Sequence, residues 1–142
     1  MKRFKLYAVM LVLALSSLVM GANAQVLRDA DFNSVGRISA NGIIRDATAH
    51  SVGSFDPDGT IRNKSGEALG KIVRLDILDA EGNRVGFITS DGSVRDGENN
   101  ELGKVNLSDG KVTNADQEVL GYARGIRVDW IACYYFFGFF DK

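Results

Sequence analysis

A short phrase recurs through the chain at a nearly constant interval, and this period constrains the fold more than any other feature. An aliphatic residue followed by glycine occurs six times, with successive glycines 17, 17, 16, 17 and 18 residues apart. The six pairs are Val35-Gly36, Val52-Gly53, Leu69-Gly70, Val85-Gly86, Leu102-Gly103 and Leu120-Gly121. A fixed period of this length indicates a chain built from one repeated structural unit.

Further positions are fixed relative to these glycines. An aliphatic residue stands nine residues before each glycine, at Leu27, Ile44, Ile61, Ile77, Val94 and Val112. Two residues after that aliphatic comes an aspartate or asparagine, at Asp29, Asp46, Asn63, Asp79, Asp96 and Asn114. An apolar residue follows each glycine by two positions, at Ile38, Phe55, Ile72, Ile88, Val105 and Ala123. Matches at this many positions indicate copies of a single unit.

Turn signals divide each unit into short strands. Asp-Gly or Asn-Gly pairs occur at residues 41–42, 58–59, 91–92 and 109–110. Such pairs favour tight hairpins because glycine adopts positive φ without a steric clash, and Pro57 presets one of these turns. Each unit therefore predicts two strands of about four or five residues. Since no segment beyond residue 24 shows helical periodicity over more than a turn or two, we predict an all-β chain.

The glycine of each unit is predicted to form a β-bulge near the centre of the fold. In a regular strand Val52 and Phe55 would face opposite sides, and a bulge at Gly53 brings both to one face. The apolar positions of one unit cannot form a core alone. Adjacent hairpins must therefore close around a shared centre, which also avoids exposed sheet edges, with the glycines near the axis and the polar turns outside.

One unit departs from the pattern. The segment between Gly70 and Gly86 is one residue short and lacks the Asp-Gly turn. Leu75 and Asp76 stand where that turn should be, so we expect an altered hairpin there and leave its register open.

The N-terminus reads as a secretion signal. Basic residues at positions 2, 3 and 5 precede an apolar stretch, residues 6–20, and small residues follow at Ala22 and Ala24. We predict a signal peptide over residues 1–24, cleaved between Ala24 and Gln25, and a periplasmic or extracellular location. The alternative is a retained membrane helix, for which the apolar stretch is short of the roughly 20 residues required.

Removal of residues 1–24 leaves 118 residues, 25–142, which we assign to a single domain. This part carries 14 basic and 18 acidic residues, a balance of −4, because three of the 17 basic residues belong to the signal. A mildly acidic chain argues against nucleic-acid binding and against electrostatic docking on anionic lipid.

The aromatic residues gather at the C-terminus. Eleven aromatics lie beyond residue 24, and eight of them lie at or after Tyr122. We expect this tail to fold back and fill the centre of the ring, where large aromatic side chains supply buried area. The alternative is an exposed apolar surface, Trp130–Phe140, that contacts a membrane or a partner.

Three features together resemble a known family. They are the recurring Val-Gly phrase with its Asp-Gly turn, the "GYARG" at residues 121–125 and the "DWIACYYFFGFF" at residues 129–140. These resemble the secreted five-fold β-flower proteins, small exported repeat proteins found mainly in Bacteroides-type bacteria. The resemblance covers essentially all of residues 25–142. It implies about five β-hairpins closed around a pseudo-symmetry axis, and it carries no established activity and no catalytic residues.

The titratable residues form no recognisable catalytic or metal-binding motif. His50, the single histidine, occupies a loop position that differs between units and is interpreted as solvated. Cys133, the single cysteine, excludes an intrachain disulfide; we expect it to be buried, and pairing between chains is the alternative. The "DPDG" at residues 56–59 resembles part of a calcium loop, but Ser65 stands where the bidentate glutamate should be. The repeated aspartates and asparagines are instead expected to bind their own turn backbones.

We therefore predict no catalytic, cofactor-binding or metal-binding residues and no enzymatic activity. The expected function is that of an exported binding or structural module of the bacterial envelope, with an envelope protein or a glycan as partner. Two alternatives stay open. One is membrane association through the aromatic tail, and the other is a small hydrolase that uses a pair of carboxylates.

Overall fold

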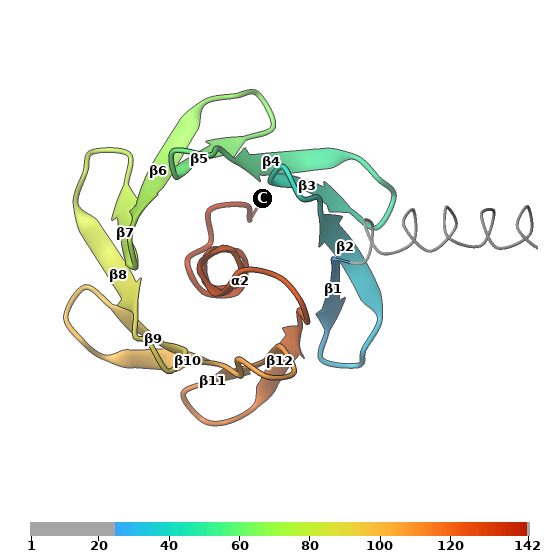
Figure 1. Ribbon diagram of the computed structural model, residues 1–142, viewed down its shortest axis with the longest axis vertical. Helices are drawn as coiled ribbons and strands as arrows, with labels where there is room; N and C mark the ends of the chain where they lie inside the picture. The colour runs from blue at the N-terminus through green and yellow to red at the C-terminus, as the bar shows by residue number, and fades with distance from the viewer. Residues whose placement is uncertain (1–24, 142) are drawn as a thin grey trace, which may run out of the picture.

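The chain closes into a ring of antiparallel strands around a short helix. The computed structural model describes residues 25–141, and in this part of the chain twelve strands each pair with their neighbours in sequence, with β12 returning to pair with β1. One helix, α2 (Val128–Phe136), occupies the middle of the ring (Figure 1). The strands are β1 (Val26–Asp29), β2 (Ser34–Ile38), β3 (Ile43–Asp46), β4 (Ser51–Phe55), β5 (Thr60–Asn63), β6 (Ala68–Val73), β7 (Asp76–Asp79), β8 (Arg84–Ile88), β9 (Ser93–Asp96), β10 (Glu101–Val105), β11 (Lys111–Asn114) and β12 (Val119–Tyr122).

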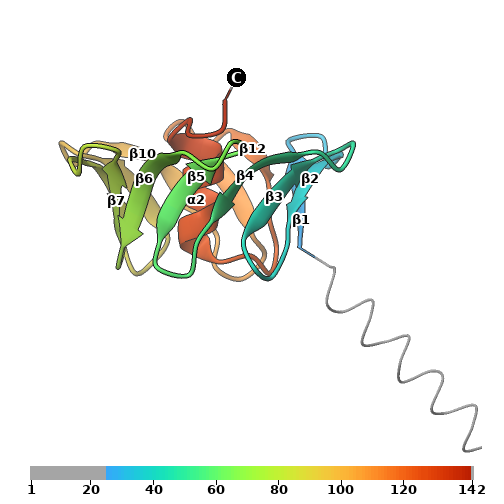
Figure 2. The ribbon, with the colours of Figure 1, turned by 90° about the horizontal axis from the view of Figure 1, so that it is seen from above.

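The ring has two unlike ends. The turns that follow β1, β3, β5, β7, β9 and β11 flare outward at the end where the C-terminus lies (Figure 2). The turns that follow the even-numbered strands lie at the opposite end and stay nearer the axis (Figure 2). We call these the wide end and the narrow end. Helix α2 therefore runs from the narrow end to the wide end.

The predicted β-bulge is present in every wide-end hairpin. In the first hairpin Leu27 pairs with Gly36 and Arg28 pairs with Ser34, so Val35 is the extra residue. The same shift in register occurs in the other five. The bulge leaves Gly36 and the residue two positions later, Ile38, buried inside the ring, while Val35 packs partly against the core. In an unbulged strand Val35 and Ile38, which are three residues apart, would face opposite sides.

The repeated apolar positions form the core, as expected. The aliphatic residues nine positions before each glycine are all 0% exposed. The apolar residues two positions after each glycine are at most 7% exposed. Phe55 is the largest of these, and its ring stacks on the Trp130 ring of α2 with 5.2 Å between centroids. The ring and the C-terminal tail thus share one core, and the expected aromatic filling of the centre is confirmed.

Helix α2 was not predicted, and the expectation that no segment beyond residue 24 is helical is wrong for the tail. The helix is apolar on nearly all sides, and its buried residues are consecutive: Asp129, Trp130, Ile131, Ala132 and Cys133. A helix surrounded by a barrel has no solvent-facing stripe, so its sequence lacks the alternation of apolar and polar faces that marks a surface helix. The all-β prediction holds for the ring itself.

The irregular unit between Gly70 and Gly86 forms a tighter hairpin than the others. Strand β6 is six residues long, and Val73 pairs with Asp76, so Arg74 and Leu75 alone make the turn. Arg74 takes a φ of 59°. The other narrow-end connections, at residues 39–42, 56–59, 89–92 and 106–110, are longer, and their glycines have positive φ as predicted.

The closed all-β ring expected from the repeat is confirmed, and between residues 25 and 141 it consists of six hairpins. The predicted signal peptide, residues 1–24, lies outside the described residues. Among the residues that are described, no helix has the length and apolar character needed to cross a membrane.

Candidate functional site

Each wide-end turn is organised by the aspartate or asparagine that ends the preceding strand. In the turn after β9, Oδ1 of Asp96 accepts hydrogen bonds from the backbone N–H groups of Glu98 and Asn100, both at 2.9 Å. The equivalent side chain makes the same two bonds in the other five turns. The interpretation of these residues as turn-forming groups is confirmed.

Hydrogen bonds within the turns also favour the ionised form of two of these carboxylates, Asp46 and Asp96. The hydroxyl of Thr48 and the backbone N–H of His50 hold the pKa of the Asp46 carboxyl below its ordinary value of 3.8. The backbone N–H of Asn100 lowers the pKa of Asp96 in the same way. Such carboxylates remain ionised at neutral pH and are poorly suited to deliver a proton.

The aromatic tail packs around the inside of the wide end and places one ring against the glycine of five of the six units. A Cβ atom added to Gly121, Gly103, Gly86, Gly70 or Gly53 would collide, respectively, with the ring of Tyr135, Phe136, Phe137, Phe139 or Phe140. Successive rings of the tail therefore contact the units in reverse order, from the last unit of the sequence to the second. We call these five side chains the aromatic collar. The hydroxyl of Tyr135 donates to the carbonyl of Arg28 at 2.7 Å and ties the collar to β1.

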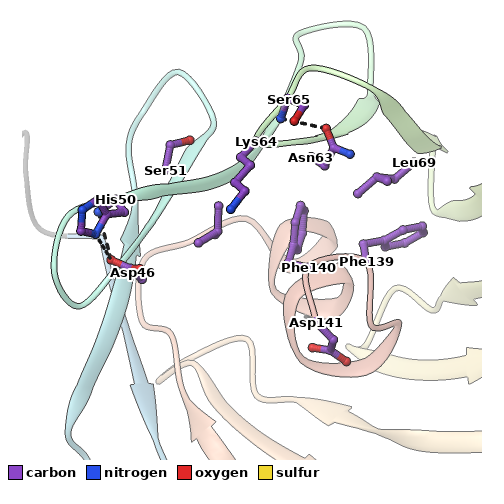
Figure 3. A pocket seen from close by; sticks show the side chains of 11 residues that line it. Asp46, His50, Ser51, Asn63, Lys64, Ser65, Leu69, Phe139, Phe140 and Asp141 are labelled. Atoms are coloured by element: carbon purple, nitrogen blue, oxygen red, sulfur yellow. Dashed lines mark hydrogen bonds and ion pairs between the residues drawn. The ribbon is translucent and has the colours of Figure 1, made fainter.

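The aromatic collar does not complete the circuit of the ring. A hollow lies at the wide end beside the last collar residues, Phe139 and Phe140. This hollow, of about 660 Å³, lies between the turn after β3 and the turn after β5 (Figure 3). Its apolar lining comes from Phe139 and Phe140 with the strand residues Val52 and Leu69. We call it the Phe140 hollow. The Phe140 ring is held edge-on against Phe55, with 5.6 Å between ring centroids.

Polar side chains surround the apolar lining of the Phe140 hollow. They are Asp46, His50, Ser51, Asn63, Lys64, Ser65 and Asp141. Figure 3 shows Lys64 extending toward the middle of the hollow from one side, with Asp141 on the other side of the Phe139 and Phe140 rings. Lys64 forms no ion pair with any residue between 25 and 141. An apolar floor with a few converging polar groups is typical of a ligand site.

His50 lies at the rim of this hollow. Its side chain is 80% exposed, as expected of a solvated loop residue, and its Nδ1 lies 2.8 Å from Oγ1 of Thr48. Nothing in the sequence singled out Lys64 or Asp141. The hollow exists because the tail stops beside two particular turns, which the repeat alone does not specify.

The other residues considered from the sequence lie away from the Phe140 hollow. Cys133 is buried within α2, as predicted, and burial raises the pKa of its thiol well above the ordinary value. The "DPDG" segment forms a narrow-end turn, in which Gly59 has a φ of 98°. Within residues 25–141 no three histidine, cysteine, aspartate or glutamate side chains are grouped closely enough to hold a metal ion.

Comparison with known protein families matches residues 24–140 to the 5-fold beta-flower protein family. The match covers most of the chain, so the chain belongs to this family, and the resemblance drawn from the repeat and the tail is confirmed. Comparison with curated proteins and comparison with solved structures gave no match. The family match brings no enzymatic role with it.

Proposed function

We propose that this member of the 5-fold beta-flower family is an exported, non-enzymatic binding protein that holds its ligand in the Phe140 hollow. The proposal rests on one observation. Where the aromatic collar ends, Phe139 and Phe140 line the same hollow as polar residues of two turns. All five collar rings cover repeated glycines, but only Phe139 and Phe140 also line an open space together with polar groups.

The hollow is supported by elements that hold its shape. Asp46 and Asn63 are fixed by hydrogen bonds to their own turns, and Phe140 is packed against Phe55. A site formed in advance loses little conformational entropy on binding. The closed ring supplies this rigidity, because all strands of the described chain have partners on both sides.

The arrangement of the titratable groups favours binding over catalysis. Asp46 is kept ionised by its turn, and Nδ1 of His50 lies against Thr48 rather than against a serine. Nucleophilic catalysis requires a nucleophile within hydrogen-bond reach of its base. No hydrogen bond joins Ser51 to His50 in the described chain, so the hydrolase alternative has less support.

Membrane association through Trp130–Phe140 also has less support. Trp130 is 8% exposed, and the collar rings rest on glycines of the barrel wall. Insertion into a bilayer would require these rings to leave the core they share with Phe55.

Export is the second part of the proposal, and it follows from the predicted signal peptide. The chain expressed with its own N-terminus in a bacterium should be recovered outside the cytoplasm with a mass that lacks residues 1–24. Recovery of the uncleaved chain in the cytoplasm would contradict this part.

Ligand binding is tested by chemical-shift mapping. The mature chain, that is residues 25–142, is labelled with ¹⁵N and titrated separately with an oligosaccharide mixture, a peptide mixture and phospholipid vesicles. The proposal expects one of the first two to shift the backbone amides of residues 46–52, 63–69 and 139–141. If all three leave these amides unchanged, or if shifts arise only elsewhere, the hollow is not the binding site.

A further inference from the structure

We propose that the ligand of the Phe140 hollow is an acidic saccharide, a pyranose that carries a carboxylate. This inference rests on the proposed function and names its ligand class. In the arrangement we infer, the sugar ring lies on Phe139 and Phe140, its carboxylate faces Lys64, and its hydroxyl groups face Asp141 and the serines of the rim.

The hollow holds one ammonium group, that of Lys64, beside the carboxylates of Asp46 and Asp141, so an anionic group fits only on the Lys64 side. Lys64 has no carboxylate within ion-pairing distance among residues 25–141, although Asp46 and Asp141 line the same space. Its side chain extends toward the hollow (Figure 3). An ammonium group placed this way binds a carboxylate through a charge-assisted hydrogen bond. One cation suits a single carboxylate better than a phosphate, which sites usually grip with several donors.

The apolar part of the hollow suits a pyranose ring. Phe139 and Phe140 are partly exposed and share the lining with Val52 and Leu69. The faces of an aromatic ring carry partial negative charge and attract polarised C–H groups. A pyranose presents such C–H groups on its face and hydroxyl groups along its edge.

The polar rim can satisfy those hydroxyl groups. Ser51 and Ser65 can donate or accept, and Asp141 accepts with two oxygens. Asp141 is an exposed carboxylate that makes no side-chain hydrogen bond or ion pair within the described chain, so its oxygens are available. A volume of about 660 Å³ accommodates one or two sugar rings.

Other ligand classes fit the structure less well. An extended peptide that binds by strand addition needs a free sheet edge, and the ring is closed over residues 25–141. Nucleic acid needs a basic surface, whereas the chain beyond residue 24 carries four more acidic than basic residues.

The test compares one sugar in charged and neutral form. Trigalacturonic acid and its methyl ester are titrated into the mature chain, and affinity is measured by calorimetry and by amide shifts at the hollow. The acid should bind about tenfold more tightly than the ester, as expected for one charge-assisted hydrogen bond. This preference should shrink between about 0.01 M and about 1 M salt.

Two variants test whether Lys64 causes the preference for the acid over the ester. Lys64→Gln should bind the acid and the ester equally, while Lys104→Gln, an exposed lysine of β10 that does not line the hollow, should keep the wild-type preference. Both replacements are at exposed positions, so both variants should fold, which their melting curves check.

The outcomes separate the two proposals. Equal affinity for acid and ester in the wild type, or an undiminished preference in Lys64→Gln, overturns the acidic-saccharide inference. If a neutral sugar or a peptide nevertheless shifts the amides of the hollow, the proposed binding function stands without it. If no tested ligand shifts them, the proposed function and the inference fail together.

Discussion

In every wide-end turn, the residue three positions after the strand-ending aspartate or asparagine has a left-handed backbone, with φ between 68° and 88°. Two of these residues are glycines, and the other four are Phe32, Ala49, Asn99 and Gln117. A side chain in this conformation costs about 1–2 kcal/mol relative to the right-handed region, which glycine avoids. Four of the six turns therefore carry local strain that the hydrogen bonds of the turn offset.

Exchanging glycine and alanine at equivalent turns should change stability in opposite directions. Ala49→Gly should raise the free energy of unfolding by about 1 kcal/mol, and Gly82→Ala should lower it by about the same amount. A Cβ atom at Gly82 would meet nothing within 4 Å, so the second change reports backbone strain alone. Urea unfolding of both variants checks this. Two variants with the same stability as the wild type would show that the turns are not strained.

Two of the turn aspartates, Asp46 and Asp96, should make stability depend on pH. The pKa values of Asp46 and Asp96 are lowered in the folded chain, so the unfolded chain takes up protons first as the pH falls. Their contribution is therefore present above the ordinary value of 3.8 and is lost as the pH falls through the lowered pKa.

Replacement of one aspartate by asparagine tests this pH dependence. Asp96→Asn keeps the accepting oxygen, as Asn63 and Asn114 do in their turns, but cannot be protonated there. Its unfolding free energy should lie below that of the wild type at neutral pH, because the charge-assisted hydrogen bonds are lost, and it should decline less on acidification. Denaturation curves at several pH values decide the matter, and parallel declines would count against the assigned role.

At the scale of the elements, one strand in five of the six hairpins packs closely against both its neighbouring strand and a ring of the tail. A Cβ atom on Gly86 would collide with the carbonyl oxygen of Arg95 and with the Phe137 ring. On Gly36 it would collide with the carbonyl of Arg45, and no collar ring is among its nearest neighbours. Gly36 therefore reports on packing between strands alone, whereas Gly86 reports on packing between strands and on packing against the tail.

Alanine at these two glycines should have unequal effects. Both replacements crowd a carbonyl, and overpacking of this kind costs about 1–3 kcal/mol. Gly86→Ala should cost more than Gly36→Ala, because it also displaces the Phe137 ring. Thermal melts of both variants provide the comparison. Equal losses of stability would mean that Phe137 does not rest on Gly86.

Much of the ring could be predicted from the sequence, because strands, turns and bulges depend on residues close together in the chain. The bulge before Gly53 and the turn at Asp58-Gly59 are local features of this kind. Helix α2 could not be predicted, since its burial on all sides removes the helical pattern. The pairing of Phe140 with Gly53, and with it the Phe140 hollow, depends on how far the tail travels around the ring. No local pattern encodes that distance.

Cys133 reports on the packing of α2. Its side chain is 0% exposed and its thiol pKa is raised by burial, so the reactive thiolate is scarce in the folded chain. Labelling with a maleimide at neutral pH should be at least about a thousandfold slower in the native protein than in concentrated guanidinium chloride. Comparable rates in the two conditions would place the helix outside the core.

For the whole molecule, the ring and the tail share one hydrophobic core, so we expect them to unfold together. The narrow-end half of the tail, with Trp130 and Ile131, fills the barrel, and the collar covers the repeated glycines at the wide end. The twelve strands alone would surround an unfilled centre, and a barrel of this size needs side chains or a ligand inside it. The Phe140 hollow depends on the same tail, because Phe139, Phe140 and Asp141 line it.

The central claim is that the C-terminal tail is the core of the ring. The most direct measurement compares residues 25–142 with a version that stops at Asp129. Circular dichroism melts and light-scattering masses are recorded for both. The structure predicts that the shortened chain loses its cooperative transition and aggregates, while residues 25–142 melt cooperatively. A shortened chain that remained monomeric and melted with an unchanged cooperative transition would contradict the claim and would make the tail a separate surface.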